Sequence, residues 1–210
     1  MIDDSNFDKF EDQDKRRFLS ELIIPEGIKI LSNLFKVQSP GYLPKFNAQA
    51  SGCSDRGYMT INAKYNERAT YADFILFLGV RNEPSKNYLA YASYCALEQE
   101  KMRPVAGFIV WNEAKISFED GNLMSQLDTF LHEAIHTLFF HPTLFKTFPE
   151  NSLSQSFLFY DEPASTWKIR GDNVLNQAKA YFACPSLKGV ALENAGAVTS
   201  AAAPFEKLLF

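Results

Sequence analysis

Several features that would place a chain in a common functional class are scarce or missing in this sequence. Among its 210 residues, the longest apolar runs, such as ADFILFLGV, are far shorter than the roughly 20 residues that a membrane-spanning helix needs. Basic residues are not in excess, because 21 Lys and Arg face 25 Asp and Glu, which gives a net charge of −4. These absences predict a soluble protein with no transmembrane segment and no nucleic-acid partner.

Cysteine is also scarce. Cys53, Cys95 and Cys184 leave at least one thiol without a partner in the chain, and none of them has the paired spacing of a zinc ribbon. Two interpretations stay open: buried thiols of a cytosolic protein, or remnants of a disulfide set whose other members lie outside the chain. The N-terminus is acidic where a signal peptide would be basic and then apolar, which predicts a cytoplasmic location for the chain as written.

The composition that is present belongs to a globular protein. Hydrophobic residues make up 46% of the chain, and 19 Phe and 9 Tyr supply material for a core. Helical spacing predicts a helix pair or kinked helix over residues 8–36, with Pro25 breaking the run or opening a second helix. Residues 37–57 collect Pro, Gly, Ser and Asn and predict an extended loop.

A small mixed sheet is predicted next. Segments 72–80 and 103–112 are rich in β-forming residues, while the segment between them favours either a strand or a turn-rich stretch. Apolar spacing then predicts a helix over 123–140, followed by a loop-like segment over 142–172. A last helix is predicted over 172–184, capped by Asp172 or Asn173.

All three histidines of the chain lie within ten residues, in the stretch LHEAIHTLFFHP. His132, Glu133 and His136 spell H-E-x-x-H, and on a helix the i and i+4 imidazoles project from one face and can bind one zinc ion. Glu133 lies alongside, where it can accept a proton from a water that the ion activates for attack on a peptide carbonyl. This is the zincin arrangement, and the alternative is a solvated helix face that carries two histidines by accident.

A catalytic zinc ion needs a third protein ligand, and His141 is one candidate. If the helix continues past His136, however, His141 is rotated by about 140° and serves as a ligand only if the helix breaks at once. A surface or capping position near the helix end is the alternative for His141. A carboxylate from Glu150 or Glu162 is a further option, although neither lies in a recognisable helical motif.

Beyond these residues, the sequence resembles the leishmanolysin-type zinc endopeptidases, especially the divergent copies of ciliates. The resemblance covers most of residues 15–210, and its most specific parts are R-P-x-A-G at 103–107, H-E-x-x-H, and C-P-x-L-x-G-V-x-L-E-N at 184–194. In that family the third ligand is a histidine in a later segment, and TSAAAPFEKL places Pro204 at its position. The helix-ending glycine of the family corresponds to Phe139.

The resemblance implies an α+β, metzincin-like fold, in which a small mixed sheet packs against the H-E-x-x-H helix. It implies a helical segment over 1–36, a subdomain over 37–141 and a partial, truncated C-terminal subdomain over 142–210. It also implies zinc as the cofactor, protein or peptide as the substrate, and relatives that are secreted or membrane-associated.

Three hypotheses about present activity follow. The chain is a metalloendopeptidase, impaired at Pro204, or an inactive relative that acts as a peptide-binding or cell-adhesion module, or a fragment that does not fold alone. For the second hypothesis, extended peptides would lie along an edge strand near Gly107 to Trp111.

Overall fold

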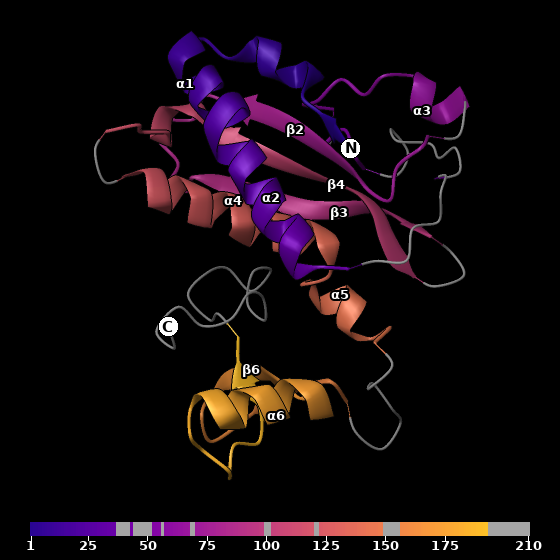
Figure 1. Ribbon diagram of the computed structural model, residues 1–210, viewed down its shortest axis with the longest axis vertical. Helices are drawn as coiled ribbons and strands as arrows, with labels where there is room; N and C mark the ends of the chain where they lie inside the picture. The colour runs from indigo at the N-terminus through magenta and orange to yellow at the C-terminus, as the bar shows by residue number, and fades with distance from the viewer. Residues whose placement is uncertain are drawn as a thin grey trace. The chain divides into compact units, whose positions relative to one another are not determined.

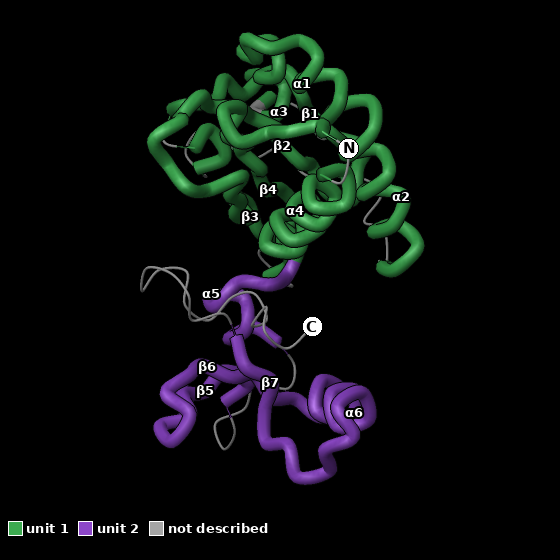
Figure 2. Tube along the Cα trace, turned by 90° about the vertical axis from the view of Figure 1, so that its left-hand side faces the viewer, with its two compact units in different colours: residues 1–138 green, residues 139–210 purple. Residues whose placement is uncertain are grey.

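The computed structural model describes residues 1–36, 43, 52–55, 57–67, 70–98, 102–119, 122–148 and 156–192. The chain divides into two compact units, Met1–Leu138 and Phe139–Phe210, which Figure 2 colours separately. Both units combine helices with a sheet, so the α+β class predicted from the sequence is confirmed. The finer predicted division at 36/37 and 141/142 stays a prediction.

The first unit begins with a short strand and a nearly continuous helical run. Asp12 caps its first turn by accepting hydrogen bonds from the backbone N–H groups of Asp14 and Lys15. A π-helical segment precedes Pro25, which has no N–H to donate, and the hydrogen-bond ladder changes register there without breaking the helix. The elements are β1 (Ile2–Asp3), η1 (Ser5–Lys9), α1 (Gln13–Arg17), η2 (Phe18–Ile23) and α2 (Ile24–Leu34).

A four-stranded mixed sheet with the order β1-β2-β4-β3 forms the centre of this unit. Strand β4 is paired on both sides, parallel to β2 and antiparallel to β3, whereas β3 lies at the edge. The predicted edge strand near Gly107 to Trp111 is therefore wrong, because those residues belong to the interior strand. The new elements are α3 (Lys64–Glu67), β2 (Ile75–Arg81), β3 (Ala90–Glu98), β4 (Arg103–Asn112), η3 (Glu113–Lys115) and α4 (Asn122–Leu138).

The two faces of the sheet carry separate apolar clusters. Alternate strand residues such as Leu76, Ile109 and Trp111 pack against α2, η2 and α4, which Figure 1 shows lying together beside the sheet. The opposite residues, including Phe77 and Val110, pack in a cluster with Leu43, Cys53, Met59, Ile61 and Tyr65. Burial of both faces explains the uninterrupted apolar character of β2 and β4.

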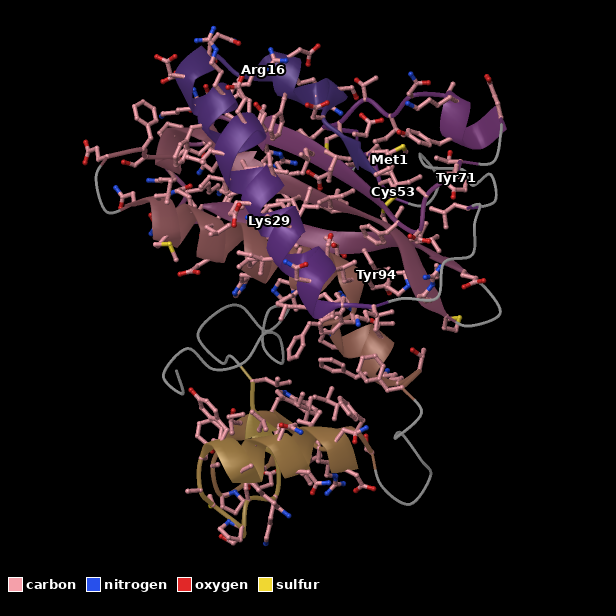
Figure 3. The ribbon with its side chains drawn as sticks, in the orientation of Figure 1. Met1, Arg16, Lys29, Cys53, Tyr71 and Tyr94 are labelled. Atoms are coloured by element: carbon pink, nitrogen blue, oxygen red, sulfur yellow. A yellow bond between two sulfur atoms is a disulfide. The ribbon has the colours of Figure 1, made fainter. Side chains whose placement is uncertain are left out.

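A disulfide joins Cys53 to Cys95 on the second of these faces (Figure 3). Both interpretations offered for the cysteines are therefore wrong for this pair, which is neither a pair of free thiols nor dependent on residues outside the chain. Cys184 takes no part in a disulfide. Sequence alone does not show which two of three cysteines form a disulfide. In this chain the bonded pair is separated by 42 positions.

The second unit corrects the prediction of a loop over 142–172. It contains α5 (Pro142–Phe145), an antiparallel hairpin of β5 (Leu158–Asp161) and β6 (Thr166–Ile169), α6 (Asp172–Tyr181) and β7 (Val190–Ala191). Helix α6 begins at Asp172, and Gly171 occupies the N-cap without a side-chain bond, so neither predicted cap residue is the cap. Asp172 instead places a negative charge in the first turn, which the helix dipole favours.

No helix in the described part of the chain is both long and apolar enough to span a bilayer.

Candidate metal centre

Helix α4 holds the H-E-x-x-H residues, as the apolar spacing predicted. Its face toward the sheet is formed by Leu127, Phe130, Ala134 and Thr137, which are 7% exposed or less. Leu131, Ile135 and Leu138, which also follow the helical apolar spacing, are only partly buried. The helix contacts the edge strand β3 and the interior strand β4, and these contacts fix its position on the sheet.

The two histidines of the motif lie on one side of α4. The ring centroids of His132 and His136 are 5.0 Å apart and their planes differ by 74°. Both side chains are half-buried, on the part of the helix surface that the core does not cover. The arrangement matches the predicted i, i+4 pair and can bring two imidazole nitrogens to one ion.

Glu133 is placed differently from the histidines, since only 8% of the residue is exposed. On a helix it lies about 100° from His132, on the flank between the histidines and the sheet. A largely buried carboxylate next to two imidazoles that could bind a metal ion suits the role of proton acceptor.

The last turn of α4 fits against β4 at a glycine. A Cβ atom added to Gly107 would lie 2.6 Å from Cβ of Thr137 and 3.0 Å from the backbone oxygen of Ser93. Thr137 is fixed in turn, because its hydroxyl donates a 2.7 Å hydrogen bond to the oxygen of Ala134. Gly107 therefore allows the turn that carries His136 to approach the sheet, a role that the sequence reading did not assign to it.

We expect Gly107→Ala to destabilise the first unit by about 1–3 kcal/mol, the usual cost of overpacking, and to lower zinc retention because α4 must move. Gly79→Ala is the matched control. An added Cβ would lie 2.5 Å from Sδ and 2.9 Å from Cγ of Met59, and this unbranched side chain can adjust more readily than the helix at Thr137. Urea unfolding of both variants checks the prediction, and equal losses of stability would contradict the proposed fit.

The proposed third ligand His141 belongs to the second unit and has a structural role there. Helix α4 ends at Leu138, so the geometric argument based on a continuing helix does not apply. His141 is the N-cap of α5, and its Nδ1 accepts a 3.2 Å hydrogen bond from the N–H of Thr143. His141 thus caps the start of the following helix and not the end of α4, where a capping role was predicted.

Of the other three candidate positions for the third ligand, the structure describes only Glu162. Pro204 and Glu150 lie outside the described residues. Glu162 lies in the turn between β5 and β6, where its backbone oxygen accepts a 3.1 Å hydrogen bond from Ser165. Among the residues that the structure describes, no three His, Cys, Asp or Glu side chains converge into a group that could hold a metal ion. Within the described residues, the candidate donors from the motif are thus the two imidazoles of His132 and His136, whereas a catalytic zinc ion needs three protein ligands.

The model of the family described as Leishmanolysin, a peptidase family, matches residues 6–209. The chain belongs to the leishmanolysin family. This membership confirms the resemblance seen in the sequence and supports an origin among metallopeptidases.

Individual relatives of the leishmanolysin family agree with this assignment. A leishmanolysin-like peptidase of Drosophila pseudoobscura pseudoobscura is 24% identical over 174 residues, which cover 65% of this chain and 25% of the relative. Those of Drosophila melanogaster and Caenorhabditis briggsae are each 23% identical, covering 70% and 74% of this chain and 27% and 29% of their own length. The chain therefore spans little more than a quarter of the length of these relatives.

Proposed function

We propose that the chain carries the catalytic-helix part of a zinc-dependent metalloendopeptidase, with His132 and His136 as two metal ligands and Glu133 as general base. The observation that carries the proposal is the 5.0 Å pair of imidazole rings beside a largely buried carboxylate, in a chain of the leishmanolysin family. Imidazole nitrogens are usual zinc ligands, so the residues present fit two positions of the site.

A bound zinc ion would supply a Lewis acid that polarises the peptide carbonyl and lowers the pKa of a water toward about 7. Glu133 would accept the proton from that water on a carboxylate oxygen and later transfer it to the leaving amine. The rigid helix holds Glu133 and the two histidines in a fixed relation, because α4 packs on β3 and β4 over its apolar face.

The substrate would lie along β3, the edge strand of the sheet, and not along β4. Strand β3 contacts α4 directly, and in the described residues no further strand pairs with its outer side. An extended peptide can add to such an edge through main-chain hydrogen bonds. This position places a bound peptide beside the helix that carries the motif.

An inactive, peptide-binding module is the second candidate function. It is favoured by Pro204, whose side chain has no donor atom and which the sequence resemblance places at the position of the third ligand of the family. In this case the edge of β3 would still bind peptide, while hydrolysis would be slow or absent. A role in cell adhesion belongs to this alternative.

The Cys53–Cys95 disulfide is relevant to the cellular compartment in which the chain folds. The N-terminal residues favoured the cytoplasm, but disulfides persist in oxidising compartments and are rare in the cytosol. The Cys53–Cys95 bond supports the proposal that the first unit folds in an oxidising compartment.

Zinc titration of the full chain tests the site. We expect weak binding by the parent and at least tenfold weaker binding by His132→Ala and His136→Ala, because each variant removes one of two ligands. His141→Ala is the matched control, and we expect its affinity to equal that of the parent.

Slow casein hydrolysis that disappears in Glu133→Gln would support the enzyme, and the absence of hydrolysis in the parent would support the binding module. Zinc affinity unchanged in both helix variants would refute the metal site.

A further inference from the structure

The edge strand β3 is regular over only part of its length. Its pairing with β4 runs without a break from Ala90 opposite Trp111 to Tyr94 opposite Gly107. The next pair is Ala96 opposite Ala106, so Cys95 is an extra residue on β3 and forms a bulge. A second irregularity follows, since Leu97 lies opposite Pro104 and Val105 is extra on β4. The edge suited to a bound strand is thus the five residues Ala90–Tyr94.

A turn at 52–55 holds this edge at two points. The turn is closed by a 3.0 Å hydrogen bond from the N–H of Asp55 to the oxygen of Gly52, and its disulfide fixes the bulged residue Cys95. Four residues earlier on the same strand, the hydroxyl of Tyr91 donates a 2.5 Å hydrogen bond to Oδ2 of Asp55. The two attachments lie near the two ends of the regular part of β3, at Tyr91 within it and at Cys95 just after it.

Asp55 is also bonded to β2, which β4 separates from β3 in the sheet. The guanidinium of Arg81, on β2, lies 2.8 Å from the same oxygen of Asp55 and stacks 3.4 Å from the ring of Tyr58. Burial and the bond to Asp55 raise the pKa of Tyr91 well above its usual range, so the phenol stays a donor. The turn is therefore bonded to β2 as well as to β3.

We propose that the turn at 52–55 positions the peptide-binding edge, with Asp55 and Tyr91 as positioning residues and Cys95 as the covalent stop at the end of the edge. The proposal rests on the proposed function, in which extended peptides bind along β3. It assigns to the site an extended segment of about five residues, because strand residues pair one to one along the edge.

The test compares two single hydroxyl deletions in the full chain. Tyr91→Phe removes the bond to the turn but keeps the ring contacts with Tyr88 and Phe108, at 5.2 and 6.4 Å between centroids. Tyr88→Phe is the matched control, because its hydroxyl donates to Glu83, which lies outside the turn. Both are made in a Glu133→Gln background, so that a bound peptide is not cleaved.

Fluorescein-labelled peptides of three, five and seven alternating threonine and lysine residues serve as the probe, read by fluorescence anisotropy. For the five-residue peptide, we expect Tyr91→Phe to raise Kd about threefold to tenfold, because a hydrogen bond to a charged group is lost, and Tyr88→Phe to leave Kd within about twofold. Affinity should rise from three to five residues and then level off. Amide exchange at residues 90–94 should be faster in Tyr91→Phe alone.

The outcomes distinguish the positioning role of Tyr91 from peptide binding along β3. Peptide binding that is equal in the parent and in Tyr91→Phe overturns the positioning role while leaving peptide binding along β3 intact. Failure of all three peptides to bind the parent background overturns peptide binding itself and, with it, the inference. If Kd falls as steeply from the five-residue to the seven-residue peptide as from the three-residue to the five-residue peptide, the proposed stop at Cys95 is wrong.

Discussion

Pro204→His should raise the zinc affinity of this chain by about 100-fold or more. Changing a residue that only supports a ligand typically alters metal affinity 10–100-fold, and adding a ligand should have at least that effect. The expectation rests on the alignment of TSAAAPFEKL with the ligand segment of the family, because Pro204 lies outside the described residues. With two imidazoles, an ion keeps extra waters and a poorly fixed geometry.

The same variant should gain peptide hydrolysis that depends on Glu133. Zinc titration gives the affinity, and casein cleavage by Pro204→His is compared with that of the Pro204→His/Glu133→Ala double variant, which keeps the ligands but lacks the base. Phe205→His is the matched control for position, since it introduces an imidazole one residue away. If Phe205→His binds zinc as tightly as Pro204→His, or if neither exceeds the parent, the alignment of this segment is wrong.

The motif helix could be predicted because two independent patterns coincide in it. The spacing of Leu127 and Phe130 fixes which side of α4 faces the sheet, and the i, i+4 spacing of His132 and His136 then places both rings on another side. Strands β2 and β4 could be predicted for a similar reason, since short apolar runs with flanking turn residues favour buried strands. Each of these elements could be predicted because the residue pattern that indicates it lies within the element itself.

The edge strand could not be predicted, because it is a property of the sheet order. Residues 103–112 have the stronger β composition, which reflects burial on both sides of an interior strand and not a position at the edge. The hairpin of β5 and β6 was missed for a different reason. Its strands have four residues each and flank the turn sequence EPAS, whose composition favours a loop.

The disulfide was the other feature beyond reach of the sequence, and its removal should have a large effect on stability. Closing a loop of 42 residues in the unfolded chain stabilises the folded state by about 4 kcal/mol in the chain-entropy model. The Cys53→Ala/Cys95→Ala double variant should lose that amount, a large part of the 5–15 kcal/mol typical of a domain, and its Tm should fall by on the order of 10–15 °C.

Thermal unfolding with and without dithiothreitol checks this expectation. The parent should lose stability on reduction, while the double variant should not respond to the reductant. Cys184→Ser is the matched control, because Cys184 forms no disulfide and lies in the second unit. The disulfide joins a turn bonded to Tyr91 and Arg81 with the bulge of β3, so the loss should also appear as faster amide exchange in β3. If the Tm of the parent does not change on reduction, the disulfide contributes little to the stability of the first unit, and this prediction is wrong.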